Sequence, residues 1–130
     1  MITYCDDISK ILEGQLAGFF VGWRKPLTPE KHLALLKGST HFVAAVDGES
    51  HQVVGFVTAL SDGVSAGFIP LLEVLPAYQG RGIGRALVEE VLRKLEGITN
   101  IDLTCDPDMQ RFYARFGMVE SHGMVLRKYL

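Results

Sequence analysis

The sequence predicts one α/β domain, spanning residues 1–130, in which a mixed β-sheet is covered by helices on both faces. Short β-rich runs alternate with segments of helical periodicity along the chain. A glycine-rich segment stands between an apolar extended run and an amphipathic helix. The composition, with 48% hydrophobic and 22% charged residues in a chain of 130, is ordinary for a globular protein with its own core.

The first third of the chain predicts one strand and two helices. Residues 2–5 form a short β-rich run that two aspartates end. Apolar residues recur at helical spacing over residues 8–21, which predicts a helix that two internal glycines weaken. Thr28 and Pro29 resemble an N-cap followed by proline at the first helical position, so we expect a second helix to about residue 37.

The middle of the chain predicts three strands. Residues 41–46 and 52–60 are β-rich, and the Asp47-Gly48 pair between them favours a hairpin. Residues 67–75 form a third run that is apolar except for one glutamate, as expected for a strand buried on both faces.

The last third predicts alternating helices and strands. Residues 83–95 carry their apolar side chains on one stripe, which is typical of a helix packed on a sheet. Residues 98–104 predict a strand, and residues 107–116 a short helix that Asp106 caps. Residues 118–129 predict a final strand.

Composition also limits the partners. The net charge is -2 and no run of Lys or Arg exceeds two residues, which disfavours nucleic acid. The N-terminus lacks the pattern of a signal peptide, and no apolar run is long enough to span a bilayer, so we expect a cytoplasmic protein with no membrane partner. Cys5 and Cys105 fit small buried apolar residues. His32, His51 and His122 fit exposed positions.

The glycine segment is the strongest functional signal. Gly80, Gly82 and Gly84 leave backbone N–H groups uncovered, and the following helix directs its positive dipole end towards them. This combination predicts a phosphate-binding turn, with a tight turn without ligand as the alternative. A P-loop lysine is absent, and the dinucleotide pattern fails because Arg85 or Leu87 stands where its third glycine is required.

The context of this segment resembles a known family. Residues 72–84 are similar to the acetyl-CoA-binding segment of the GCN5-related N-acetyltransferases (the GNAT family), with Gln79, Gly82 and Gly84 filling its core pattern. Residues 111–118 resemble the downstream Phe/Leu-Tyr-x-x-x-Gly-Phe signature of the same family. The residues leading from Thr104 into this signature are locally most similar to the arylalkylamine branch.

The resemblance implies an acyltransferase that moves the acetyl group of acetyl-CoA to a primary amine by direct attack in a ternary complex, without a metal. It implies a sheet that splays at a bulge, where the backbone of Leu72 and Val74 pairs with the pantetheine arm. It also implies that Tyr113 is the general acid that protonates the thiolate. The expected cofactor-binding residues are Leu72, Val74, Gln79, Gly80, Arg81, Gly82, Ile83, Gly84 and Arg85.

The general base is less determined. Family members that use a central-strand glutamate or histidine pair have it where this chain has Phe68, Ile69 and Pro70. Glu73 is the one acid in its apolar run and could deprotonate or bind the amine, or form a structural ion pair. His41 is a weaker alternative. Asp106 replaces the asparagine that helps hold pantetheine in many relatives, and fits a helix cap better because a carboxylate cannot donate.

The acceptor, the class of activity and the assembly each stay open. The short chain favours a small amine over a protein tail as acceptor, and Phe19, Phe20, Trp23 and Tyr4 could line its pocket or belong to the core. A non-catalytic CoA-binding module is the main competing function, and transfer to oxygen or of a longer acyl chain is a third. The C-terminal strand could pair across a homodimer, or its charges could protect a free edge.

Overall fold

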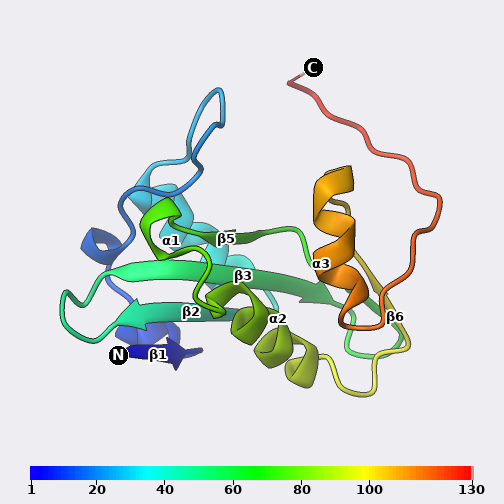
Figure 1. Ribbon diagram of the computed structural model, residues 1–130, viewed down its shortest axis with the longest axis horizontal. Helices are drawn as coiled ribbons and strands as arrows, with labels where there is room; N and C mark the ends of the chain where they lie inside the picture. Colours follow the sequence, from blue (N-terminus) through cyan, green and yellow to red (C-terminus); the bar gives the residue numbers. More distant parts are fainter. Residues whose placement is uncertain (130) are drawn as a thin grey trace.

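The computed structural model describes residues 1–129, and in them six strands form one mixed sheet (Figure 1). The strands are β1 (Ile2–Cys5), β2 (His41–Asp47), β3 (Val53–Ser61), β4 (Ala66–Phe68), β5 (Leu72–Val74) and β6 (Asn100–Asp102). Their order across the sheet is β1-β2-β3-β4-β6, and β5 pairs with β3 beside β4. All pairs are antiparallel except β4 with β6.

Three α-helices and four short 3-10 helices complete the described chain. The α-helices are α1 (Pro29–Gly38), α2 (Ile83–Lys94) and α3 (Gln110–Ala114). The 3-10 helices are η1 (Ile8–Lys10), η2 (Glu13–Gln15), η3 (Pro76–Tyr78) and η4 (Pro107–Met109). Within residues 1–129, every helix is too short or too polar to cross a membrane.

Helices cover both faces of the sheet, as predicted. Gly55 and Phe56 are neighbours on β3, so they face opposite sides. A Cβ on Gly55 would approach Leu87 of α2 to 3.1 Å, whereas the Phe56 ring lies 4.3 Å from the ring of His32 on α1. Glycine at position 55 therefore lets α2 pack closely on one face while α1 packs on the other.

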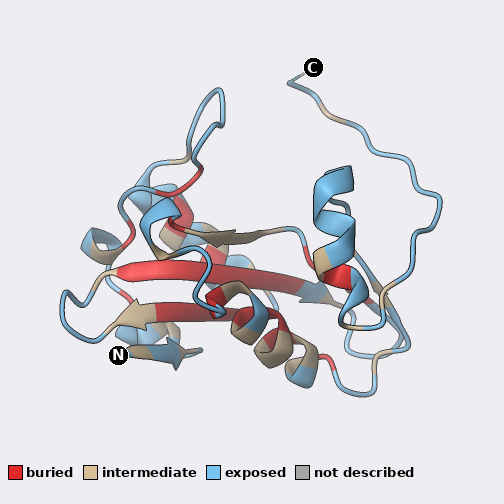
Figure 2. Ribbon diagram, in the orientation of Figure 1, coloured by how far each residue is buried: buried red, intermediate tan, exposed pale blue. Residues whose placement is uncertain are grey.

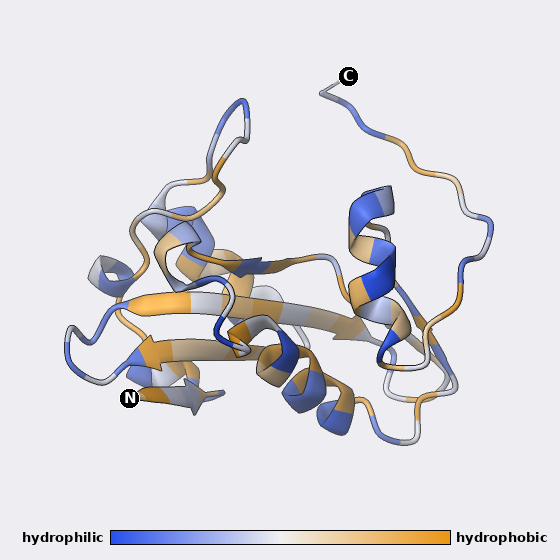
Figure 3. Ribbon diagram, in the orientation of Figure 1, coloured by the Kyte–Doolittle hydropathy of each residue, from blue (hydrophilic) through white to orange (hydrophobic). Residues whose placement is uncertain are grey.

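The core lies along the two central strands. The first seven residues of β3 are buried, and so are most of those of β2 (Figure 2). Hydrophobic positions follow the same strands, whereas they alternate with hydrophilic ones along α2 (Figure 3). The predicted hairpin is confirmed, because β2 and β3 pair antiparallel across the turn that begins at Asp47. The predicted cap of α1 is also confirmed, since the Thr28 hydroxyl accepts the N–H of Lys31 at 3.2 Å.

The prediction of one continuous strand over residues 67–75 is wrong. That segment is divided into β4 and β5 by Ile69, Pro70 and Leu71. Proline lacks the N–H that a ladder requires, so pairing is interrupted there. Both halves still run antiparallel to β3, but they pair with different parts of it. This interruption is where the sheet splays, as the family resemblance implied.

The predicted helix over residues 8–21 is also wrong. Two single-turn helices, η1 and η2, replace it, and the rest of that segment is irregular. Gly18 has a φ of +91°, and Phe20 has a φ of +63°. Neither value is compatible with a right-handed helix. The apolar residues are buried nonetheless, since Phe19 and Phe20 belong to the core.

The prediction of a final strand over residues 118–129 is wrong. No strand forms there in the described residues, and the segment runs away from the sheet beyond α3 (Figure 1). The prediction that both cysteines are buried is wrong as well. Cys105 is exposed, Cys5 is partly exposed, and both thiols are free.

His32 was expected at the surface, but the structure buries it completely. Its ring lies between those of Phe19, Phe20 and Phe56, at centroid distances of 5.1, 4.9 and 4.3 Å. Neither ring nitrogen has a hydrogen-bond partner among the described residues. Burial lowers the pKa of His32 to about 4, so the ring is neutral in the folded protein.

This histidine should make folding sensitive to acid. In the unfolded chain it gains a proton near pH 6.5, whereas in the folded protein it stays neutral until about pH 4. The stability contributed by the neutral ring is therefore complete above pH 6.5 and is lost as the pH falls towards 4. We expect a loss of up to about 3 kcal/mol in the free energy of unfolding, at about 1.4 kcal/mol per pKa unit.

Urea unfolding at pH 7 and at pH 4.5 measures this loss. In His32→Leu the pH-dependent part should be smaller by that amount, while in His122→Leu, at an exposed position, it should remain. An equal pH dependence in His32→Leu and the wild type would show that other groups cause the acid sensitivity.

Candidate active site

One edge of β5 is free. The Leu71 carbonyl accepts a β3 N–H at 3.0 Å, and the Leu75 N–H donates to a β3 carbonyl at 2.8 Å. Alternate residues of an antiparallel strand direct their backbone groups to opposite sides. Leu72 and Val74 therefore direct their N–H and C=O groups away from β3, to an edge where no strand pairs in the described chain. An extended ligand could add there as a further strand.

A cavity of about 410 Å³ lies beside this edge. It forms because β6 pairs only with the β4 half of the interrupted strand, so the chain that follows β6 diverges from β5. The walls come from β5, from the chain after β6, from α3 and from the N-terminal loop. The lining residues are Val21, Trp23, Ile69, Pro70, Leu71, Leu72, Glu73, Val74, Pro76, Gln79, Thr104, Cys105, Asp106, Met109 and Tyr113.

The glycine turn enters α2 beyond the end of β5. Gly80 and Gly82 have φ values of +78° and +81°, and a Cβ on either would meet nothing within 4 Å. Among the described residues, the N–H groups of positions 80–85 have no acceptor, and the first bond of the turn is from Ala86 to Gly82. Free donors at a helix N-terminus form an anion-binding site. The uncovered N–H groups agree with the sequence analysis, while phosphate binding at this turn stays a prediction.

Polar side chains brace the turn. The Gln79 amide donates to the carbonyl of Val74 at 3.0 Å, which fastens the turn to the free edge of β5. Arg81 donates to the carbonyl of Ala77 and its guanidinium lies 5.1 Å from the centre of the Tyr78 ring. Arg85 forms an exposed ion pair with Glu89 at 2.8 Å. Both arginines thus have partners in the protein.

Tyr113 reaches the cavity from α3. Its side chain is buried, and its hydroxyl makes no hydrogen bond with another described residue. Burial, with a smaller contribution from Cys105, raises the pKa of Tyr113 to about 12. The phenol therefore keeps its proton throughout the neutral and mildly alkaline range, and it can donate that proton to a group in the cavity.

Glu73 reaches the same cavity from β5. One carboxylate oxygen accepts the N–H of Phe20 at 2.9 Å, and the other accepts the N–H of Val21 at 3.2 Å. The side chain therefore holds the N-terminal loop against the sheet, a contact that spans more than fifty residues of sequence and that no local pattern predicted. Each oxygen retains a further lone pair for a ligand.

Several cavity residues were not predicted. Trp23 lines the cavity, but Phe19 and Phe20 lie in the core and Tyr4 lies on β1. Val21, Thr104, Cys105 and Met109 were missed as wall residues. The backbone at Asp106 does occupy the cap position of η4, yet its side chain makes no capping bond and lines the cavity instead. Sequence reasoning could have found Cys105 only from its place directly after a strand at the sheet edge.

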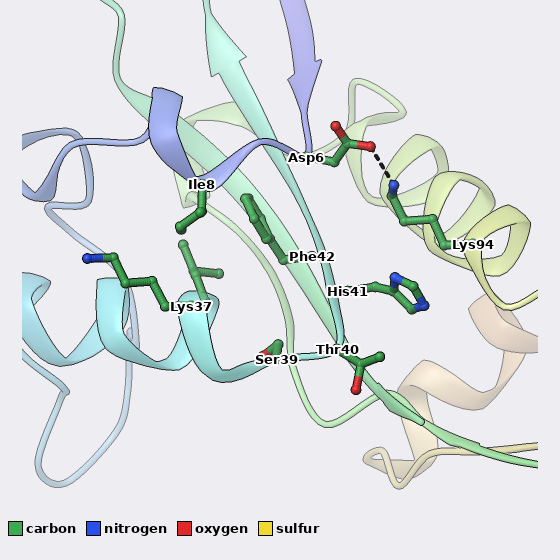
Figure 4. Close-up of a pocket in the computed structure, with 9 residues that line it drawn as sticks. Asp6, Ile8, Lys37, Ser39, Thr40, His41, Phe42 and Lys94 are labelled. Carbon is green, nitrogen blue, oxygen red and sulfur yellow. Dashed lines mark hydrogen bonds and ion pairs between the residues drawn. The ribbon is translucent and has the colours of Figure 1, made fainter. Parts of the chain in front are cut away.

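A second hollow of about 180 Å³ lies away from these groups (Figure 4). Asp6 and Lys94 form an ion pair across it, and His41 lines it together with the end of α1. His41 is thus in a different hollow from Glu73 and Tyr113, which removes its support as a base. The larger cavity, unlike this hollow, lies beside the free edge of β5 and is lined by Gln79, at the start of the glycine turn, and by Tyr113.

Comparison with known proteins agrees with this geometry. A profile of the Acetyltransferase (GNAT) family matches residues 8–118. The chain is 36% identical over 109 residues to histone acetyltransferase TAP1 of Glycine max, and 36% identical over 119 residues to the chloroplastic GCN5-related N-acetyltransferase 2 of Arabidopsis thaliana. Each match covers 75% of this chain but 46% and 45% of those proteins, so the chain spans about half the length of these relatives.

Solved structures share the whole fold. The crystal structure of a candidate acetyltransferase from Deinococcus radiodurans R1 has a TM-score of 0.95 and 41% identity, and the match covers 98% of this chain and 89% of that one. A GNAT-family acetyltransferase from Streptococcus pneumoniae TIGR4 has a TM-score of 0.74 and 27% identity, with 98% of each chain covered.

Proposed function

Since this chain belongs to the acetyltransferase (GNAT) family, we propose that it transfers the acetyl group of acetyl-CoA to a primary amine of a small molecule. The observation that carries this proposal is the meeting of three features around one cavity. The free edge of β5 and Tyr113 border one cavity, and Gln79, which also lines it, leads into the turn whose N–H groups at positions 80–85 are unpaired. Each matches one requirement of acetyl transfer.

The residues present fit the coenzyme. Its diphosphate needs donors without side chains in the way, and positions 80–85 offer N–H groups with open space at Gly80 and Gly82. Its amide-containing arm needs a strand edge, which the backbone of Leu72 and Val74 provides. An N–H of β5 would also stabilise the oxyanion, a contribution of about 10²–10³ in rate. When bound, acetyl-CoA supplies an activated thioester.

We assign the proton transfers to two side chains. Glu73 receives the ammonium group of the acceptor and removes its proton, because it is the carboxylate of β5 that faces the cavity. Tyr113 gives its proton to the departing thiolate.

We propose direct attack by the amine within a ternary complex. The alternative would pass the acetyl group through a cysteine, and Cys105 does line the cavity. Partial burial, followed by the charges of Asp106 and Asp108, raises the pKa of the Cys105 thiol. A thiol that resists ionisation is a poor nucleophile, which favours direct transfer.

The proposed acceptor carries an aromatic ring on a short chain from its amine, as in arylalkylamines. The walls near Glu73 are mainly apolar, with Val21, Ile69 and Pro70 beside the half-exposed indole of Trp23. An aromatic ring could stack on that indole while its amine meets the carboxylate. This arrangement suits a small amine better than a long polar peptide.

Release of free CoA thiol tests the proposal. We expect turnover of acetyl-CoA with phenethylamine or tryptamine at a higher kcat/KM than with spermidine, glucosamine or a lysine-containing histone peptide. If the peptide reacted faster, the acceptor would be a protein amine, while the proposed acetyl transfer from acetyl-CoA would still stand. Binding of CoA without thiol release for any acceptor would favour a CoA-binding module. Such a module is the second candidate function, because both Glu73 oxygens already accept hydrogen bonds from the N-terminal loop.

Glu73→Gln separates the two roles of this side chain. If Glu73 is the base, kcat/KM at pH 7 should fall by about 10²-fold or more. Initial rates at pH 7 measure this, with Glu89→Gln on α2 as the control. A variant with a lower melting temperature but an unchanged kcat/KM would show that Glu73 only anchors the loop.

A further inference from the structure

A hydrogen bond joins the β2–β3 hairpin to the segment before the glycine turn. The Tyr78 hydroxyl donates to Oδ2 of Asp47 at 2.6 Å, although 31 positions separate the two residues in the sequence. Asp47 is the last residue of β2, and Tyr78 is the last residue of η3. The Tyr78 ring also packs against the core. The bond therefore fastens the end of η3, directly before Gln79, to the central hairpin of the sheet.

Asp47 is itself held in place by the hairpin. Its Oδ1 accepts the N–H of Glu49 at 2.9 Å, and its backbone N–H donates to the carbonyl of Gln52 at 2.9 Å. Each carboxylate oxygen therefore has a partner. The hydrogen bond between the two side chains lowers the pKa of Asp47 and raises the pKa of Tyr78, so at neutral pH the carboxylate accepts and the phenol donates. Asp47 is thus a fixed, charged acceptor that orients the Tyr78 ring.

The Tyr78 ring supports an arginine of the glycine turn. The Arg81 guanidinium lies 5.1 Å from the ring centre, within the range of a cation–π interaction, and it donates to the carbonyl of Ala77 at 3.3 Å. Among the described residues, the N–H groups of positions 80–85 have no acceptor, so the turn is not restrained through them. The side-chain contacts of Arg81 do restrain it, and they lead back through Tyr78 to Asp47.

We propose that Asp47 and Tyr78 are positioning residues for the coenzyme, which hold Arg81, and with it the glycine turn, in the conformation that receives the diphosphate. The inference rests on the proposed binding of CoA at this turn. A long side chain that is already ordered loses less conformational entropy when a ligand binds than a free one does. Neither residue lines the cavity that Glu73 and Tyr113 border, so the pair is placed to affect coenzyme binding and not acetyl transfer.

Calorimetric titration of Tyr78→Phe and Asp47→Ala with CoA tests the proposal without an acceptor. Each variant should raise the Kd for CoA by about threefold to tenfold, the cost of ordering one long side chain on binding. The double variant should bind no more weakly than either single one, because both changes remove the same hydrogen bond. Asp47→Asn should restore the wild-type affinity, because its carbonyl oxygen can accept from Glu49 and its NH2 group can donate to the Tyr78 oxygen.

Two further measurements separate positioning from a general loss of structure. In an Arg81→Ala background, Tyr78→Phe should no longer weaken the binding of CoA, because the side chain that it supports is gone. Pantetheine, which lacks the diphosphate, should bind equally to the wild type and to Tyr78→Phe. Asp62→Ala is the matched control, since Asp62 also accepts turn N–H groups but follows the opposite end of β3. It should lower the melting temperature as Asp47→Ala does and leave the Kd for CoA unchanged.

The outcomes distinguish this inference from the function on which it rests. A wild-type Kd for CoA in Tyr78→Phe and Asp47→Ala would overturn the positioning role and leave CoA binding at the turn intact. An equal loss of affinity for pantetheine, or an undiminished effect of Tyr78→Phe in the Arg81→Ala background, would overturn it as well. A wild-type protein that binds no CoA would refute the proposed function and this inference with it.

Discussion

The Tyr113→Phe variant should lose about 10²–10⁴-fold in kcat while its affinity for CoA stays the same. The hydroxyl is the one part of this side chain that can supply a proton, and it is held in the cavity without a partner in the described chain. The pKa of Tyr113 is raised to about 12, so ionisation of the phenol should not reduce the wild-type rate until the pH approaches that value. Steady-state rates from pH 7 to 11 measure both effects.

The stability of this variant is its control. The hydroxyl lines the cavity and makes no hydrogen bond with another described residue, so its removal should leave the melting temperature nearly unchanged. Phe116→Leu, in the turn that follows α3 and not lining the cavity, should keep its kcat. If Tyr113→Phe retained full kcat, the residue would only pack α3 against the sheet, and another group would have to protonate the thiolate.

The Gly82→Asp variant should bind CoA at least tenfold more weakly than Gly82→Asn. Both side chains tolerate the φ of +81° at this position better than other residues do, so the backbone cost is similar in the two variants. They differ by one negative charge at the N-terminus of α2. Like charges about 5 Å apart repel by about 3 kcal/mol at an effective dielectric of 20, and salt reduces this towards the 1.4 kcal/mol that equals tenfold.

Calorimetric titrations of both variants with CoA and with pantetheine measure the difference in affinity. Pantetheine lacks the diphosphate, so the two variants should bind it equally. Gly84→Ala is the matched control, because its Cβ would meet Phe112 and Val74 at ordinary contact distances of 3.7 and 3.8 Å. Equal binding of CoA by the Asp and Asn variants would exclude the turn as the diphosphate site.

The sequence predicted best where local rules act alone. Thr28 and Pro29 determine the start of α1 by capping and by a fixed φ, and Asp47-Gly48 determines a hairpin in the same way. The glycine turn was predicted because its property, free backbone donors, belongs to the glycines themselves. For the same reason the position of Tyr113 followed from a motif on one helix.

The predictions that failed concern residues whose environment is set by contacts with residues far away in the sequence. Glu73 looked like an isolated acid in an apolar run, because its partners Phe20 and Val21 are remote in sequence. His32 looked exposed, because the three phenylalanines that enclose it come from two other segments. The segment 118–129 has the composition of a strand, yet a strand also needs a neighbour to pair with, and none pairs with it in the described chain.

The one-sided attachment of β5 has a thermodynamic consequence. A three-residue strand anchored along a single side is a weakly supported part of the sheet, and the coenzyme would serve as its missing neighbour. Occupancy then adds to resistance against denaturation, by about 2.7 kcal/mol at a ligand concentration a hundred times Kd. The folding equilibrium of this protein would thereby report the supply of acetyl-CoA, and depletion of that metabolite would leave the chain more open to proteolysis.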